Sequence, residues 1–259
     1  MYRNTFLSVM FLACCFNGSL CAQSDAQIYE RTCDAKTYPF SDPSPVATPN
    51  NSYYPYFRFD GFSMQAQEKQ WKMVVLENDY VKLTVTPEIG GKIWGAIDKV
   101  NNKEFVYTNG VVKFRDVAMR GPWTSGGIEF NFGIIGHAPT CSTPIDYLTK
   151  KNVDGSVSCH IFSYEWITRT VWNVEINLPK DKAYFTTHTT WFNQSSIDQP
   201  YYQWMNAGYA TKTGTRFYYP GTYSIGHSGD LHPYPIDEEG RDVSWYDNNN
   251  FGASKSLHI

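Results

Sequence analysis

The apolar residues of this chain fall into short runs or alternate with polar residues, and helical periodicity is weak throughout. Val74 to Glu77 and Val81 to Thr86 flank the turn-forming pair Asn78-Asp79, so this stretch predicts a hairpin. Pro87 to Gly91 predicts a second turn, and Lys92 to Asp98 predicts the strand that follows it.

The second half of the chain continues in the same way. Val157 to Leu178 is rich in β-branched and aromatic residues and predicts either two strands or one bulged strand. Tyr184 to Asn193 and Tyr201 to Tyr209 predict two more strands. Short strands with turn signals every ~8–12 residues predict an all-β, antiparallel sandwich or barrel.

The N-terminus has the pattern of a targeting segment. Arg3 precedes the apolar run Thr5 to Phe16, and a small residue, Ala22, precedes Gln23, so residues 1–22 predict a signal peptide. Lipoprotein processing at one of the early cysteines is the alternative. We therefore expect an exported protein, periplasmic or extracellular, without a transmembrane segment in the mature chain, because no other apolar stretch approaches ~20 residues.

The mature chain divides into two segments. Residues 23–56 carry many Pro, Ser, Asn and Asp residues and few periodic apolar positions, so we expect an extended lead-in. Residues 57–259 form the predicted β domain. Gly252 to Ile259 has the pattern of the beginning of a strand, which suggests a fragment of a longer protein.

The composition of the chain limits the classes of molecule that it can bind. The net charge is −3 and no basic run occurs, which argues against a nucleic-acid partner. Aromatic residues make up 17% of the chain, a level that fits both β structure and glycan-binding surfaces. Three cysteines follow the predicted cleavage site, Cys33, Cys141 and Cys159; Cys141 and Cys159 either pair or remain buried thiols.

The segment from Arg115 to Thr140, RDVAMRGPWTSGGIEFNFGIIGHAPT, concentrates chemically useful residues. Apolar Ile128, Phe130 and Phe132 alternate within it with Glu129 and Asn131, which predicts a strand with one apolar and one polar face. A carboxylate and an amide on one face, beside aromatic rings, suit the hydroxyls and the apolar face of a sugar. An ordinary solvated strand face is the alternative.

Glu129 is the leading candidate for an acid or base, since burial among aromatic residues raises the pKa of a carboxyl group. The alternative is a structural ion pair with Arg115 or Arg120. Both arginines can instead hold a substrate carboxylate, as in a uronic acid. His137 lies in a glycine-flanked loop and can act as the partner acid, or form a loop-stabilising hydrogen bond.

Trp123, Trp204 and Asn206 complete the predicted substrate-binding set together with Asn131. Trp204 and Asn206 share parity within their strand and therefore point to one face, although core packing is the usual role of a single tryptophan. Three further tryptophans have mostly apolar neighbours of the same parity and are expected in the core: Trp94, Trp166 and Trp172. We expect no metal and no cofactor, because His227 and His232 lack a third ligand at a suitable spacing.

Several motifs carry a resemblance to a known family: VLENDYVKLTVTPEIGGKIWGAIDKVNNKEFVY from Val75, RGPWTSGGIEFNFGIIGHAPT from Arg120 and YYQWMNAG from Tyr201. From about Tyr53 to Ile259 the chain resembles the bacterial domain of unknown function 5107. The resemblance implies a galactose mutarotase-like β-supersandwich in exported proteins of glycan-using bacteria. It names no reaction, and the late base glutamate of true mutarotases has no evident match here.

Two kinds of function follow from these residues. The first is an enzyme, either a glycoside hydrolase or a sugar epimerase, that uses Glu129. Hydrolysis needs a second carboxylate, for which Asp116, Asp146 and Glu165 are weak candidates. The alternative is a non-catalytic carbohydrate-binding module, or a structural domain of a longer protein, with an oligosaccharide or polysaccharide as the expected partner of the module.

Overall fold

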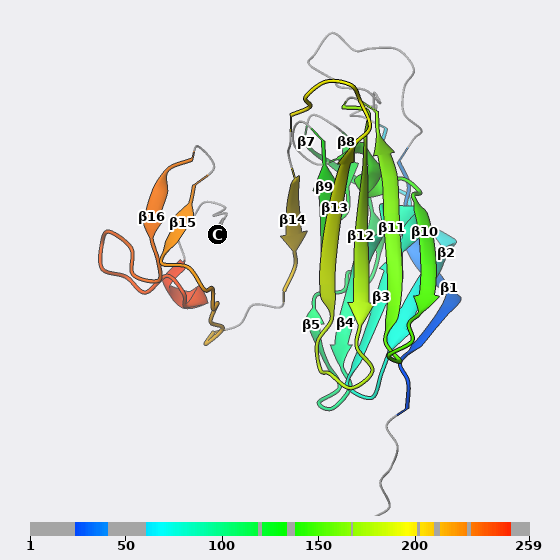
Figure 1. Cartoon of the computed structure of the whole chain (residues 1–259), viewed down its shortest axis with the longest axis horizontal. Coiled ribbons are helices and arrows are strands. Elements are labelled where there is room, and N and C mark those ends of the chain that lie inside the picture. The colour runs from blue at the N-terminus through cyan, green and yellow to red at the C-terminus, as the bar shows by residue number, and fades with distance from the viewer. Residues whose placement is uncertain are drawn as a thin grey trace, which may run out of the picture.

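The computed structural model describes residues 24–40, 61–118, 121–133, 138–166, 168–200, 203–209, 213–226 and 229–249, and the regular secondary structure of these residues consists almost entirely of strands. Figure 1 shows two sheets that lie face to face, so the predicted all-β sandwich is confirmed. The strands are β1 (Gln27–Tyr38), β2 (Gln67–Glu77), β3 (Val81–Thr86), β4 (Lys92–Asp98), β5 (Lys103–Val106), β6 (Val112–Lys113), β7 (Arg115–Ala118), β8 (Gly121–Trp123), β9 (Ile128–Phe132), β10 (Asp146–Lys151), β11 (Val157–Glu165), β12 (Thr170–Leu178), β13 (Thr186–Asn193), β14 (Gln203–Ala207), β15 (Tyr223–Ile225) and β16 (Leu231–Pro233). Three short 3-10 helices complete the set: η1 (Pro87–Ile89), η2 (Pro139–Ser142) and η3 (Tyr246–Asn249).

The larger sheet has the strand order β14-β9-β4-β3-β2-β1-β6, with β5 paired to β4, and the smaller sheet has the order β10-β11-β12-β13. Strands that neighbour one another in both sheets are antiparallel, except that β1 and β6 run parallel. The predicted hairpin around Asn78 is β2–β3, and Val157 to Leu178 forms two strands. Asn78 fixes the first turn, because its Oδ1 accepts hydrogen bonds from the backbone N–H groups of Tyr80 and Val81.

The described part of the predicted lead-in is a strand of the larger sheet. β1 pairs with β2 along eleven residues, from Gln27 opposite Glu77 to Thr37 opposite Gln67. Most β1 side chains are exposed or half-buried, so the strand contributes backbone hydrogen bonds and few apolar contacts. This explains why its sequence carries little apolar periodicity, and it places the start of the sheet at Gln27, ahead of residue 57.

The apolar core lies between the two sheets. Phe132 of the larger sheet stacks on Trp172 of the smaller one, with ring centroids 4.5 Å apart and planes 10° from parallel. The buried side chains of this core include Val74, Leu76, Leu83, Val85, Ile93, Ile128, Phe130, Phe132, Cys159, Ile161, Trp172, Val174 and Ile176. The opposite face of the larger sheet carries a second buried apolar cluster: Trp71, Met73, Ile89, Trp94, Val112 and Phe114.

The expectation that three tryptophans lie in the core is right for Trp94 and Trp172, which are buried, and wrong for Trp166, which is 64% exposed. The register of β11 and β12 gives the reason. Val157 pairs with Leu178, and Ile161 with Val174, so odd positions of β11 face the core together with even positions of β12. Residues 166–169 connect the two strands, and Trp166 follows the outward parity of β11.

None of the three cysteines of the described chain forms a disulfide, so Cys141 and Cys159 do not pair. Cys159 is fully buried in the core on β11, and burial raises the pKa of its thiol to about 12. Cys33 on β1 is half-buried and donates a weak hydrogen bond to the carbonyl of Asp34. Cys159 therefore acts as a packing group of the core.

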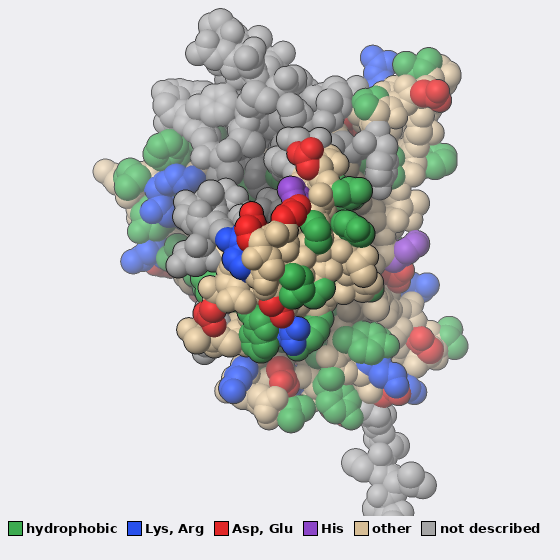
Figure 2. Space-filling view, turned by 90° about the vertical axis from the view of Figure 1, so that its left-hand side faces the viewer, with side chains coloured by type: hydrophobic (Ala, Val, Ile, Leu, Met, Phe, Trp, Pro, Cys, Tyr) green, Lys and Arg blue, Asp and Glu red, His purple; other side chains and the backbone are tan. Residues whose placement is uncertain are grey.

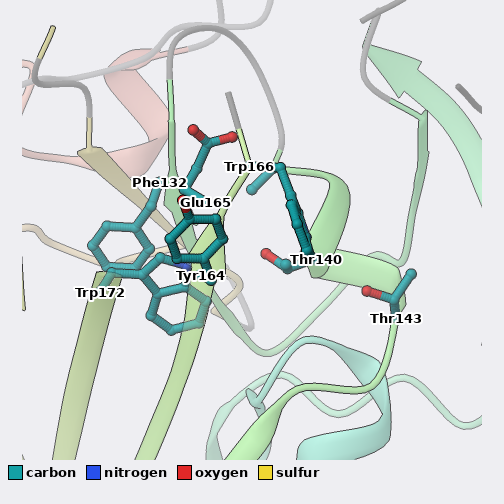
Figure 3. Close-up of a pocket in the computed structure, with 8 residues that line it drawn as sticks. Phe132, Thr140, Thr143, Tyr164, Glu165, Trp166 and Trp172 are labelled. Atoms are coloured by element: carbon teal, nitrogen blue, oxygen red, sulfur yellow. The ribbon is translucent and has the colours of Figure 1, made fainter. Parts of the chain in front are cut away.

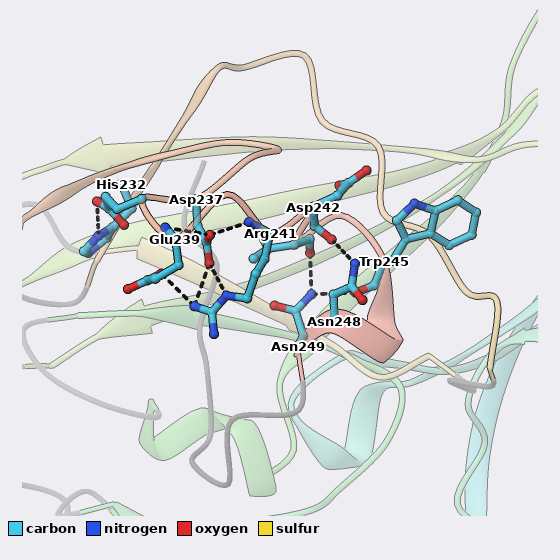
Figure 4. Close-up of polar contacts among 10 residues, drawn as sticks. His232, Asp237, Glu239, Arg241, Asp242, Trp245, Asn248 and Asn249 are labelled. Atoms are coloured by element: carbon cyan, nitrogen blue, oxygen red, sulfur yellow. Dashed lines mark hydrogen bonds and ion pairs between the residues drawn. The ribbon is translucent and has the colours of Figure 1, made fainter.

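The C-terminal residues 213–249 contain the hairpin β15–β16 and η3, and Figure 1 shows them beyond the edge strand β14. Charged side chains stabilise a turn within this part: Arg241 bonds to both Asp237 and Glu239 (Figure 4). Figure 2 views this side of the molecule, where hydrophobic side chains lie on the surface among acidic and basic ones. The exposed apolar side chains of residues 213–249 include Tyr218, Tyr219, Tyr223, Ile225, Leu231 and Ile236.

Candidate functional site

Four of the predicted site residues lie on one face of the larger sheet, at the pairing of β9 with β14. Asn206 is opposite Glu129 and Trp204 is opposite Asn131. Residues paired in this way point to the same face, and the core-facing Ile128, Phe130 and Phe132 occupy the other face of β9. The predicted polar face therefore exists, and it faces away from the core between the sheets.

Glu129 lies at the centre of this face and is only 2% exposed. Its Oε1 accepts a hydrogen bond of 2.8 Å from Asn131 Nδ2 and a longer one of 3.4 Å from Asn206 Nδ2. Its Oε2 is 3.8 Å from the Nζ of Lys92. A buried carboxylate normally requires such partners, since a carboxylate removed from water without them is costly.

Lys92 reaches Glu129 because β4 and β9 are neighbours in the sheet. The register pairs Ile93 with Ile128, which places Lys92 beside Glu129 on the same face. The ammonium also donates a hydrogen bond of 3.0 Å to Thr124 Oγ1 and another to the Thr124 carbonyl. The Lys92 ammonium is therefore held between Glu129 and Thr124.

Burial lowers the pKa of Lys92 below its ordinary value, and the charge of Glu129 opposes that shift. The ammonium also lies 5.9 Å from the ring centroid of Trp123, a cation–π distance. Lys92 thus links the Glu129 carboxylate to Trp123 on β8. Glu129 and Lys92 are buried at the centre of the site. The residues around them, Trp123, Trp204 and Asn206, are half-buried and therefore partly open to solvent.

Asn131 is fully buried and connects the polar face to the chain that follows β9. Its Nδ2 donates to Glu129, and its Oδ1 accepts a hydrogen bond of 2.8 Å from the backbone N–H of Ala138. Both ends of this amide are therefore engaged within the protein. Asn131 positions Glu129, whereas Asn206 is the more accessible amide for a ligand.

Arg115 makes no contact with Glu129 among the described residues. It pairs with Trp123 in the two-stranded sheet of β7 and β8, but its guanidinium packs 4.7 Å from the ring centroid of Phe62. It donates hydrogen bonds to the Phe114 carbonyl and to Met64 Sδ. The ion pair with Glu129 that the sequence suggested for Arg115 is thus replaced by one with Lys92.

The remaining predicted residues fall into two groups. Arg120 and His137 lie outside the described residues, as does the side chain of Asp116. Asp146 and Glu165, the other candidates for a second carboxylate, belong to β10 and β11 of the smaller sheet. Glu165 Oε2 accepts hydrogen bonds from the backbone N–H and the hydroxyl of Thr168, which gives this carboxylate a role in the turn.

Sequence reasoning missed Lys92 and Thr124, the cationic side of the site. One signal was present: Lys92 is charged but shares the parity of Trp94 at the start of a strand in which the first five residues are buried. The decisive information is the pairing of β4 with β9, strands that are separated along the chain by β5 to β8. Local patterns do not specify such long-range register.

The site offers a carboxylate acceptor, an amide and an ammonium beside two indole rings. Within the described ranges, no group of three His, Cys, Asp or Glu residues is placed to hold a metal ion. His232, one of the two histidines considered as ligands, has its Nδ1 3.3 Å from Glu238 Oε1.

Among the described residues, no helix is both long and apolar enough to cross a bilayer.

Comparison with known proteins identifies a family and a fold. The family described as "Domain of unknown function (DUF5107)" matches residues 48–259. A TPR-domain containing protein from Parabacteroides distasonis has a similar solved structure, with a TM-score of 0.73 and 24% sequence identity. The similarity covers 85% of this chain and 38% of the other chain, so the present chain spans well under half of the length of that protein.

Proposed function

This chain belongs to the DUF5107 family, and from the polar site on its larger sheet we propose that it binds carbohydrate. The family description names no activity, and the related structure shows the fold alone. The proposal therefore rests on the chemistry of the site.

The observation that carries the proposal is the clustering of Glu129, Lys92 and Asn206 beside half-buried tryptophans. Glu129 is a hydrogen-bond acceptor, Lys92 a donor, and the Asn206 amide is both. A sugar hydroxyl is also both donor and acceptor, so such a set can bind several hydroxyls at once. The apolar face of a sugar ring packs on an aromatic ring, and the half-buried Trp123 and Trp204 lie beside these polar groups.

Binding explains the site better than hydrolysis does. The ammonium 3.8 Å from Glu129 and the Asn131 amide both stabilise the carboxylate charge, which suits an acceptor of hydroxyl hydrogen bonds. A glycosidase needs a second carboxyl group about 5–9.5 Å away across the scissile bond. Asp146 and Glu165 are on the opposite sheet of the sandwich, which favours recognition over cleavage.

A glycan array tests the proposal. We expect the protein to bind one class of oligosaccharide or polysaccharide, and Asn206→Ala to lose most of that binding because a half-buried hydrogen-bonding group is removed. Asn177→Ala is the matched control, since Asn177 is a half-buried, hydrogen-bonded asparagine on β12 of the other sheet. Equal binding by both variants would assign the sugar to another surface.

Glu129→Gln separates binding from catalysis. The substitution keeps the shape of the side chain and its acceptor for the Asn131 amide, but removes the carboxylate. If the protein also turns over the glycan it binds, turnover in this variant should vanish while binding persists. If the variant kept both turnover and binding, Glu129 would not belong to the site.

We also propose that the protein acts outside the cytoplasm, on the pattern of residues 1–22. N-terminal sequencing of the protein recovered from a bacterial host is expected to begin at Gln23. An intact N-terminus at Met1 in a protein retained in the cytoplasm would contradict export.

A further inference from the structure

The end of the β11–β12 hairpin carries an exposed aromatic pair with no role in the site on the larger sheet. Trp166 is 64% exposed, and Tyr164 beside it is half-buried. Their ring centroids are 5.2 Å apart with planes at 82°, an edge-to-face contact. Tyr164 therefore supports the Trp166 indole from one edge and leaves much of its surface exposed to solvent.

A small cavity of about 90 Å³ opens beside this pair. Phe132, Ala138 and Trp172 form the apolar part of its wall. Glu165 also lines the cavity, and its Oε2 is bonded to Thr168. Figure 3 shows Thr140 and Thr143 on the side of Trp166. Benzene needs a cavity of about 150 Å³, so the cavity beside Trp166, at about 90 Å³, is too small for a sugar ring. It accepts a methyl or small acyl group, and the two threonine hydroxyls can bond to the polar atoms of that group.

A larger polar hollow of about 710 Å³ adjoins the cavity, and Tyr164 lines both. Hydroxyl and amide groups of Ser195, Ser196, Gln194 and Gln199 line the hollow together with the guanidinium of Arg169. No Asp or Glu lines it, and Arg169 has no carboxylate partner in the part of the chain that the structure describes. An accessible guanidinium beside neutral hydrogen-bonding groups favours an anionic, hydroxylated ligand.

We propose that this region is a second binding site, separate from Glu129, for an acidic sugar that carries a small acyl group. The acyl group enters the cavity against Phe132 and Trp172, while the ring packs on Trp166. The carboxylate of the sugar pairs with Arg169, and its hydroxyls bond to the glutamine and serine side chains of the hollow. Glu129 lines neither the cavity nor the hollow, so binding here is independent of the first site.

Fluorine NMR of protein labelled with 5-fluorotryptophan tests both sites in one experiment. The chain has eight tryptophans, and single Trp→Phe variants assign their resonances. Three probes dissect the ligand: N-acetylneuraminic acid has both an acid and an acyl group, glucuronic acid has only the acid, and N-acetylglucosamine has only the acyl group. We expect N-acetylneuraminic acid to shift the Trp166 resonance saturably, with the other two at least about tenfold weaker.

Variants identify the residues that produce the shift. Trp166→Ala should abolish binding of N-acetylneuraminic acid, and Arg169→Gln should reduce its affinity to that of the neutral probe. Phe192→Ala on β13 is the matched control, since Phe192 is 57% exposed on the same sheet but lines neither hollow. The control should bind as the unaltered protein does.

The proposal is overturned if the Trp166 resonance does not move with any probe up to about 10 mM, a concentration that exceeds a millimolar Kd. Equal binding of all three probes, or unaltered binding by Arg169→Gln, overturns it as well. Trp123 and Trp204 report on the first site at the same time. A shift confined to their resonances supports the site at Glu129 and refutes this one, whereas a shift confined to Trp166 supports this one and leaves the site at Glu129 to the glycan array.

Discussion

The buried pair of Lys92 and Glu129 makes a quantitative prediction. Both side chains are 2–3% exposed, and their charged atoms are 3.8 Å apart. Lys92→Met removes the ammonium beside the buried Glu129 carboxylate, and Glu129→Gln removes the carboxylate beside the buried Lys92 ammonium. Removal of one member of a buried pair costs about 3–5 kcal/mol, because the remaining charge is desolvated without compensation.

The double variant Lys92→Met/Glu129→Gln should lose less stability than the sum of the losses in the two single variants. It leaves no buried charge at the pair, and the amide oxygen that Glu129→Gln introduces still accepts hydrogen bonds from Asn131 and Asn206. We expect a coupling free energy of roughly 1–3 kcal/mol. At about 2–4 °C per kcal/mol for a domain of this size, Lys92→Met should lower Tm by about 6–20 °C.

Urea unfolding followed by tryptophan fluorescence gives the four free energies of the cycle. The control is Lys82→Met, which removes a partly exposed pair with Glu77 at 3.5 Å on neighbouring strands of the same sheet. A pair of this kind contributes about 0–1 kcal/mol. Additive single effects, or a Lys92→Met cost no larger than that of the control, would refute the account of the buried pair.

Other predictions follow from single positions. Gly127 has φ +67°, a left-handed conformation that costs an alanine ~1–2 kcal/mol of free energy of unfolding. A Cβ there would also clash with the backbone oxygen of Ile93, so Gly127→Ala should lower the free energy of unfolding by several times that amount. Gly240→Ala, at φ +76° with open space around it, should cost only that strain, and equal losses in urea unfolding would contradict the clash. Burial raises the pKa of Cys159 to about 12 from an ordinary 9.0, so its contribution to the free energy of unfolding is full below pH 9 and is lost as pH rises toward 12. Cys159→Ala should therefore reduce the loss of stability at alkaline pH, and an unchanged pH profile would contradict this role of Cys159. Iodoacetamide should label native Cys33 well before Cys159, as read by peptide mass spectrometry, and equal rates would show that the core opens readily.

Elements with a strong local signal were predictable from the sequence. β4 has the predicted bounds Lys92–Asp98, since a glycine-containing turn precedes it and apolar residues fill it. β9 shows the predicted alternation of Glu129 and Asn131 with the core residues. Turn residues and a period of two are local properties, which is why they can be predicted from one sequence.

Features that depend on strand pairing were not predictable. The position of β1 in the sheet depends on its backbone bonds to β2, and its exposed side chains give no signal. The exposure of Trp166 depends on a four-residue connection that reverses the core-facing parity between β11 and β12. Lys92 joins the site only because β9 pairs with β4, and no pattern within either strand specifies that partner.

Thermal unfolding of the protein, alone and with each member of a glycan panel, tests carbohydrate binding directly when Asn206→Ala is measured in parallel. A ligand that prefers the native state stabilises it by about 2.7 kcal/mol at one hundred times its Kd, which is several degrees in Tm. The account predicts that one class of sugar raises Tm for the unaltered protein and has little effect on Asn206→Ala. A Tm that no sugar raises, or a rise of the same size in the variant, would contradict it.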